Sequence, residues 1–177
     1  TTASTLTFYI FIPYVKSKTK FSKKLLPTLN GTGQGYFTQP TISNKQIIFV
    51  CENDLWQVPL EGGRAQRLTS SRSETHSPVY SPNGQWIACC TMEEGEHDVY
   101  LMESSGGPLQ RLTWLNSVTH IVSWSHDGQY IWFRSTHQAV HSRGSDAWIF
   151  RVSINGGPVE RLPYGPAMTV DLQVNGK

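Results

Sequence analysis

Short apolar stretches, broken by glycine and proline, run along most of the chain. Every second residue from Trp56 to Leu60 is apolar, as expected for a strand that buries one face. No stretch of ten or more residues keeps a helical period without an interrupting glycine or proline. Fifteen glycines and ten prolines favour short strands joined by turns. The pattern predicts an all-β fold.

Three copies of one sequence pattern follow one another along the chain. Each copy contains an aromatic segment, a Gly-Gly pair and, at a fixed offset, Arg-Leu. The Gly-Gly pairs begin at Gly62, Gly106 and Gly156, so the spacings are 44 and 50 residues. Four strands can be assigned to each copy. This period and strand number are typical of a β-propeller blade.

The second copy illustrates the four expected strands. Strand a covers Pro78–Ser81, and Asn83-Gly84 then makes a tight hairpin turn in which both residues should have positive φ. Strand b is the apolar run Trp86–Cys90, and strand c is the aromatic segment around Tyr100. The Gly-Gly pair leads into strand d, which ends at Arg-Leu-Thr.

The repeats predict a partial β-propeller, with three four-stranded blades and the start of a fourth. Propellers close with about 4–8 blades, so the chain is expected to be a fragment of a longer domain. The expected propeller region is 35–177, with blades at about 35–69, 76–113 and 118–163 and the fourth beginning in 164–177.

The basic residues are unevenly distributed. Residues 1–33 contain five lysines and no acidic residue, whereas the rest of the chain has ten basic and thirteen acidic residues. The main body therefore has no basic face for nucleic acid. The longest apolar run, Leu6–Val15, is shorter than the ~20 residues of a membrane span. We expect 1–34 to be a poorly ordered basic segment; an arm lying on a membrane surface is the alternative.

The first repeat carries a more specific signal. The run Ile47–Cys51, followed by Asp54-Leu55-Trp56, resembles the opening blade of tricorn-type proteases. The stretch Gly165–Met168 is similar to the segment that enters the fourth blade in that family. The resemblance covers about residues 35–177.

The resemblance implies a part of a larger peptidase. Tricorn-type proteins are cytoplasmic serine peptidases that assemble into large homo-oligomers and trim oligopeptides. They contain a six-bladed propeller, a seven-bladed propeller, a PDZ-like domain and C-terminal catalytic domains. This chain would be the first half of the six-bladed propeller, so no catalytic residue is carried over to it. No cofactor, nucleic acid or membrane partner is implied.

A second interpretation stays open. Repeats such as Ser81-Pro82-Asn83-Gly84 also occur in TolB-like and other WD40-like propellers. The alternative function is therefore a protein-interaction module without a peptidase. The sequence beyond Lys177 would distinguish the two.

Recurring charged residues have a structural interpretation. Asp54 and Asp98 open strand c, where they are expected to cap turns or to pair with the repeated arginines. Trp148 takes this place in the third repeat, which weakens any common ligand role for the aspartates. The arginines recur in every blade and are expected to be architectural: Arg67, Arg111 and Arg161.

Few residues are candidates for direct function. Strand a lines the central channel of a propeller, so Thr41, Val79 and Ser123 are the candidate peptide contacts. His137 and His141 are four residues apart but lie in an expected loop, and no metal site is predicted there. The three cysteines have no metal-type spacing, and buried reduced thiols are expected.

Overall fold

The computed structural model describes residues 36–71, 73–138, 147–164 and 166–169, in which every regular element is a β-strand. The strands are β1 (Thr38–Ser43), β2 (Gln46–Cys51), β3 (Asp54–Pro59), β4 (Gln66–Arg67), β5 (Thr75–Tyr80), β6 (Trp86–Thr91), β7 (Asp98–Glu103), β8 (Gln110–Arg111), β9 (Thr119–Trp124), β10 (Tyr130–Ser135), β11 (Trp148–Ser153) and β12 (Glu160–Arg161). In this described part, no helix is long and apolar enough to cross a membrane.

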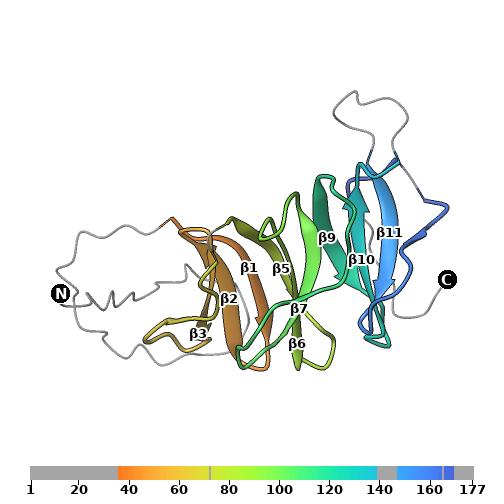
Figure 1. The fold of residues 1–177 in the computed structure, drawn as a ribbon. Helices are drawn as coiled ribbons and strands as arrows, with labels where there is room; N and C mark the ends of the chain where they lie inside the picture. The colour runs from red at the N-terminus through yellow and green to blue at the C-terminus, as the bar shows by residue number, and fades with distance from the viewer. Residues whose placement is uncertain (1–35, 72, 139–146, 165, 170–177) are drawn as a thin grey trace.

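The twelve strands form three antiparallel sheets of four strands each. The orders are β1-β2-β3-β4, β5-β6-β7-β8 and β9-β10-β11-β12, so each strand pairs with its neighbour in sequence. The sheets follow one another along the molecule (Figure 1). The predicted all-β fold with four strands per repeat is confirmed.

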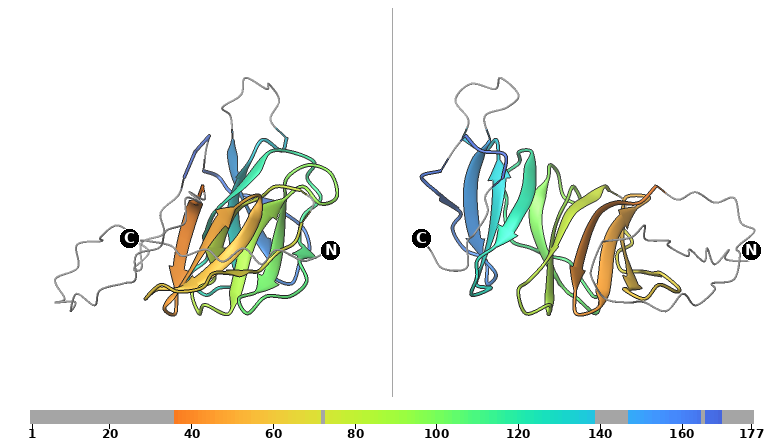
Figure 2. Two further views of the ribbon diagram at one scale, coloured as in Figure 1. Left: turned by 90° about the vertical axis from the view of Figure 1, so that its left-hand side faces the viewer. Right: turned by 180° about the vertical axis from the view of Figure 1, so that it is seen from behind.

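The first strands of the three sheets lie on the same side of the molecule. β1 packs beside β5, and β5 packs beside β9, as the two rotated views also show (Figure 2). The last strand of each sheet has two residues and lies at the other edge. Sheets that approach one another through their first strands are arranged as successive propeller blades, and the partial propeller is confirmed.

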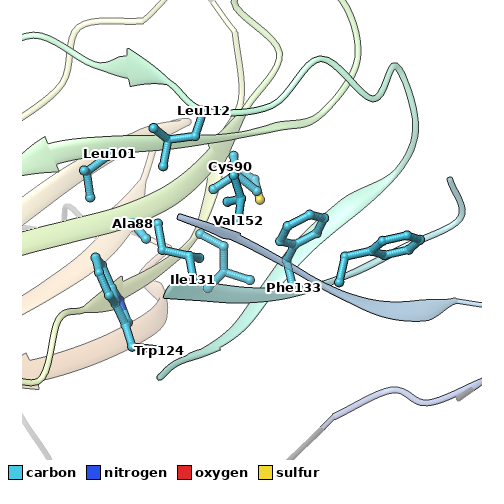
Figure 3. Packing of buried hydrophobic residues seen from close by; sticks show 11 residues of the cluster. Ala88, Cys90, Leu101, Leu112, Trp124, Ile131, Phe133 and Val152 are labelled. Carbon is cyan, nitrogen blue, oxygen red and sulfur yellow. The ribbon is translucent and has the colours of Figure 1, made fainter. Parts of the chain in front are cut away.

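Two apolar clusters fill the seams between the sheets. Ile48 and Val50 from the first sheet pack with Ile87 and Cys89 from the second. On the other face of β6, Ala88 and Cys90 join the third sheet in a cluster that includes Phe133 (Figure 3). The middle sheet is thus buried on both faces. This is why its second strand is a continuous apolar run and does not alternate with polar residues.

The turn prediction for the second repeat is wrong in one respect. Gly84 has a φ of 70°, but Asn83 does not have positive φ. The loop is longer than a two-residue turn: the Gly84 N–H donates to the Ser81 carbonyl over 2.8 Å. The Asn83 Oδ1 accepts from the Ser81 hydroxyl over 2.7 Å and from the Gln85 N–H over 3.0 Å. The asparagine therefore stabilises this loop through its side-chain acceptor.

The two-residue turn occurs instead in the first sheet. Asn44 and Lys45, which join β1 to β2, have φ values of 46° and 63°. Both residues are thus in the left-handed region that such a hairpin requires.

The predicted boundaries at the two ends of the chain remain predictions. The basic segment 1–34 lies outside the described residues. Of the expected fourth blade, the structure describes 164 and 166–169, and these residues form no strand. The Ala167 N–H donates to the Ala147 carbonyl over 2.9 Å, which holds this segment against the third sheet.

Candidate functional site

The aspartate that opens β7 is a buried structural group. The Asp98 Oδ2 accepts a hydrogen bond from the Arg111 guanidinium over 2.7 Å. Its Oδ1 accepts from the Thr113 hydroxyl over 2.6 Å and from the Leu115 N–H over 2.9 Å. Asp98 is fully buried, and these three donors satisfy its carboxylate. The expected pairing with the repeated arginine is confirmed here.

The first sheet repeats this arrangement. Asp54 forms an ion pair with Arg67 and accepts from the Thr69 hydroxyl over 2.7 Å and the Ser71 N–H over 3.1 Å. In both sheets, an aspartate at the start of the third strand thus binds an arginine of the fourth strand and two residues that follow it. Neither carboxylate is directed at an open ligand site.

The third sheet has an aromatic ring at this place. Trp148 is paired with Ser135 at the end of β10, as Asp98 is paired with Thr91 at the end of β6. The Arg161 guanidinium lies over the indole, 3.5 Å from the ring centroid. A cation–π contact replaces the ion pair, so the arginine keeps its architectural position while its partner changes.

The three predicted channel residues occupy one equivalent position. They pair with equivalent residues of the neighbouring strands: Thr41 with Ile48, Val79 with Ala88 and Ser123 with Trp132. All three are half-buried. Val79 packs against the apolar cluster between the second and third sheets. Contact of these residues with a peptide stays a prediction.

Bulges near Thr41 and Val79 help to connect β1 to β5. The register of β1 shifts between Thr38 and Thr41, and that of β5 shifts between His76 and Val79. Gln39 and Ser77, the first residues of these bulges, have φ values of 52° and 53°. The Ser77 N–H donates to the Gln39 Oε1. The strain of two left-handed residues is thus used to connect β1 to β5.

Three histidines and a serine form a connected cluster at this end of the first strands. His76 Nε2 lies 2.6 Å from His97 Nδ1, and His76 Nδ1 lies 3.0 Å from the Ser77 hydroxyl oxygen. That oxygen lies 3.4 Å from His120 Nδ1. The ring centroid of His76 is 4.6 Å from that of His97 and 4.9 Å from that of His120. The cluster joins β5, the β6–β7 loop and β9.

The environment favours the uncharged form of two of these histidines, His76 and His120. Burial, followed by the charges of His97, His120 and Arg134, lowers the pKa of His76 from 6.5 to about 4. Burial and then Arg134 also lower the pKa of His120. His76 is only 4% exposed. Both shifts have the same physical cause, because a buried imidazolium loses hydration and faces other cationic groups.

The contact between Ser77 and His76 lacks the features of a nucleophile and its base. An imidazole with such a low pKa is a weak proton acceptor at neutral pH. The Ser77 N–H already donates to Gln39, and the next residue, Pro78, has no N–H. The two main-chain positions that would commonly stabilise an oxyanion are therefore not available.

Sequence reasoning did not single out this cluster. The available signal was the repeat period, because His76 and His120 are 44 residues apart, as are Gly62 and Gly106. Among the described residues, no group of three or more His, Cys, Asp and Glu side chains is arranged to hold a metal ion.

The other singled-out histidines and the cysteines lie elsewhere. His137 contacts the Phe150 ring edge-on with centroids 5.9 Å apart, whereas His141 is outside the described residues. The three cysteines are buried and free: Cys51, Cys89 and Cys90. Burial raises the pKa of Cys89 to about 12. The expected buried thiols are confirmed.

Comparison with known proteins identifies the domain. A family model described as the tricorn protease N-terminal beta propeller domain matches residues 34–177. Tricorn protease homolog 1 from Streptomyces coelicolor is 33% identical over 131 residues, which are 74% of this chain and 12% of that protein. This chain therefore spans a small part of that relative.

Solved structures agree at the level of the fold. The crystal structure of the tricorn protease matches with a TM-score of 0.69 and 24% identity, over 80% of this chain and 14% of that chain. TolB from Acinetobacter baumannii matches with a TM-score of 0.56 and 20% identity, over 73% of this chain and 33% of that chain. The family model covers most of the sequence, and the resemblance expected from the first repeat is confirmed. This chain belongs to the family of tricorn protease N-terminal beta propeller domains.

Proposed function

We propose that this chain is a non-catalytic propeller portion of a cytoplasmic tricorn-type serine peptidase that degrades oligopeptides. In this role it serves as a scaffold or a passage for peptides, within a homo-oligomer of the whole protein. The observation that carries the proposal is the family match over residues 34–177.

The geometry of the described residues supports a scaffold. The recurring charged residues are used inside the blades, as with Asp98 and Arg111. The contact between Ser77 and His76 lacks free oxyanion donors, as described above. The use of these groups for packing supports a scaffold role for residues 36–71, 73–138, 147–164 and 166–169.

A passage for peptides would be lined by the first strands. β1, β5 and β9 lie side by side, and in a closed ring these strands surround the central axis. Thr41 and Ser123 are the half-buried polar residues at the equivalent position of β1 and β9. We infer that these two positions meet a peptide in the channel.

The proposal is tested with the full-length product of the gene. We expect it to cleave fluorogenic oligopeptides and to react with a fluorophosphonate probe at a serine outside residues 1–177, located by mass spectrometry. The Ser77→Ala variant should cleave at the wild-type rate. Labelling of a serine within 1–177, or loss of activity in Ser77→Ala, would contradict the proposal.

The same experiment addresses the alternative function. A full-length protein that ends after its propeller and cleaves no peptide in the panel would overturn the peptidase proposal and support a TolB-like interaction module. The solved TolB structure shares the fold with a TM-score of 0.56.

The channel is tested separately with single cysteines. Thr41→Cys and Ser123→Cys should react with a bromoacetyl oligopeptide. The three native cysteines of this chain are buried, so the labelling reports on the introduced cysteine. Ser105→Cys, at an exposed position between β7 and β8, is the control. At each position we compare the labelling rate of the peptide reagent with that of iodoacetamide. This ratio should be about tenfold higher at the two channel positions than at Ser105→Cys, because the peptide binds in the channel before it reacts. Equal preference at all three sites would exclude the channel role.

A further inference from the structure

We propose that His76, Ser77, His97 and His120 form an acid-sensitive latch at the inner edge of the seam between the second and third sheets. The hydrogen-bonded chain is closed while the imidazoles are neutral and opens when more than one proton is bound. This inference concerns the blades themselves and is independent of what passes through the channel.

The latch consists of three consecutive contacts. His97 of the β6–β7 loop and His76 of β5 are joined over 2.6 Å. Ser77 connects to the His76 ring over 3.0 Å and to His120 of the third sheet over 3.4 Å. The chain therefore begins in the β6–β7 loop and crosses the seam at Ser77. The cross-seam contact is the longest of the three, and so the weakest.

Neutral imidazoles satisfy every contact. Each neutral ring has one N–H donor and one nitrogen acceptor, and a serine hydroxyl can donate and accept. Donation can run from His97 through His76 and Ser77 to His120, or in the reverse direction. Either direction gives each contact one donor and one acceptor. The closed chain thus needs no counter-ion.

Additional protons disrupt the chain. A single proton on His76 is compatible with both of its contacts, since both nitrogens then donate. A second proton on the pair places an N–H of His97 against an N–H of His76, across the 2.6 Å that separates their nitrogens. Two donors and two like charges cannot remain at this distance. The His97 side chain must then move away.

The nearest cationic side chain outside the cluster also disfavours additional protons. Arg134 of β10 pairs with His120 across the strands and lowers the pKa of His76 and of His120. Glu74, just before β5, opposes this at His120. Asp98, next to His97, is already held by Arg111. Glu96 directly precedes His97 but is exposed, so water screens its charge.

Opening of the latch is expected to be local. The rest of the seam is held by a large apolar cluster that includes Cys90, Ile121 and Phe133. These side chains do not titrate in the acidic range, so the seam remains closed along the bodies of the sheets. The change is confined to the ends of β5 and β9 where the latch lies.

The experiment measures hydrogen exchange of the full-length protein at pH 7.5 and pH 4, corrected for intrinsic exchange rates. Peptides that cover β5 and β9 should lose protection at least tenfold more than peptides that cover β6 and β10. Exchange at the imidazole C2 position, read by mass spectrometry, should show His76 titrating well below the ordinary histidine pKa of 6.5. Uniform loss over all four strands, or titration of His76 near 6.5, would overturn the latch.

Variants assign the effect to the latch. His97→Gln and His120→Gln keep a hydrogen-bonding side chain that does not protonate, and both positions are half-buried. Each should reduce the acid-induced loss at β5 and β9 by at least half, whereas His126→Gln should leave it unchanged. A wild-type acid response in both latch variants would refute the proposal even if the wild-type protein opens as described.

Discussion

Arg161 lies over the indole of Trp148, with its guanidinium carbon 3.5 Å from the ring centroid. In the second sheet, the equivalent pair is the ion pair of Arg111 with Asp98. The blades therefore keep one arginine position and accept two different partners for it. A planar cation allows this, because guanidinium binds a carboxylate through its N–H groups and stacks on an aromatic ring through its face.

The stacked pair should contribute measurably to stability. Trp148→Leu is expected to lower the free energy of unfolding by about 1–2 kcal/mol through loss of the cation–π contact and of ring packing. The matched control is Trp114→Leu, because Trp114 is 66% exposed and Arg111 lies 5.4 Å from its ring centroid. The control should cost less than about 0.5 kcal/mol. Urea unfolding monitored by circular dichroism measures both, and equal costs would show that the stacking has no special role.

The buried carboxylate of the second sheet should be far more sensitive. Asp98→Ala removes the acceptor for Arg111, Thr113 and the Leu115 N–H. Breaking a buried pair in this way is expected to cost about 3–5 kcal/mol. Glu94→Ala removes the other carboxylate that contacts Arg111, but its side chain is 70% exposed. That control should cost about 0–1 kcal/mol, and a loss for Asp98→Ala no larger than the control would contradict a structural role.

The repeat pattern predicted the architecture because the repeated residues occupy the same structural positions in each blade. The recurrence of Gly62, Gly106 and Gly156 was sufficient to place strands c and d in all three sheets. The burial of β6 on both faces was readable from its continuous apolar run. These features are local in sequence or repeat at a fixed period, so a single sequence contains them.

The histidine cluster could not be predicted in the same way. The sequence pattern predicts that strand a of the second repeat begins at Pro78, but β5 begins at Thr75 and continues through a bulge. The contact of His76 with His97 also depends on the path of the β6–β7 loop. Bulges and loop paths are set by tertiary packing, and alternation of apolar residues does not encode them.

A hydrogen bond across the first seam gives a third prediction. Gln57 of β3 donates through Nε2 to the Tyr80 hydroxyl over 3.0 Å and to the Ser104 carbonyl over 3.3 Å. Tyr80→Phe should cost about 0.5–1.5 kcal/mol, since it removes one contact and leaves the ring in place. In a Gln57→Leu background, the same substitution should cost less than about 0.5 kcal/mol in a double-mutant cycle. An unchanged cost in that background would mean that the two side chains are not coupled.

The cysteines should be inert in the folded protein. Cys51, Cys89 and Cys90 are buried, and burial raises the pKa of each thiol. Since the thiolate is the reactive form, Ellman's reagent at pH 8 should modify no cysteine of this chain in the folded state and all three in urea. For Cys51, burial and then the charge of Glu52 raise the thiol pKa. Rapid modification of any of the three in the folded protein would contradict the described packing.

The lowered pKa of His76 gives the folded protein a defined sensitivity to acid. Above pH 6.5 the ring is neutral in both the folded and the unfolded chain, so it contributes no pH dependence. Between pH 6.5 and about 4 the unfolded chain binds a proton that the folded chain does not, because the pKa of His76 is lowered to about 4. As the pH is lowered across this window, the free energy of unfolding should decrease by about 3 kcal/mol, and it should level off below about pH 4.

Urea unfolding at half-unit steps of pH measures this slope. Carboxylates also titrate in this range, and their contribution is subtracted by comparing the wild-type protein with His76→Gln. The variant should flatten the slope, whereas His126→Gln, at an exposed position, should retain it. A slope of wild-type size in His76→Gln would mean that this imidazole is not the group that destabilises the fold in acid.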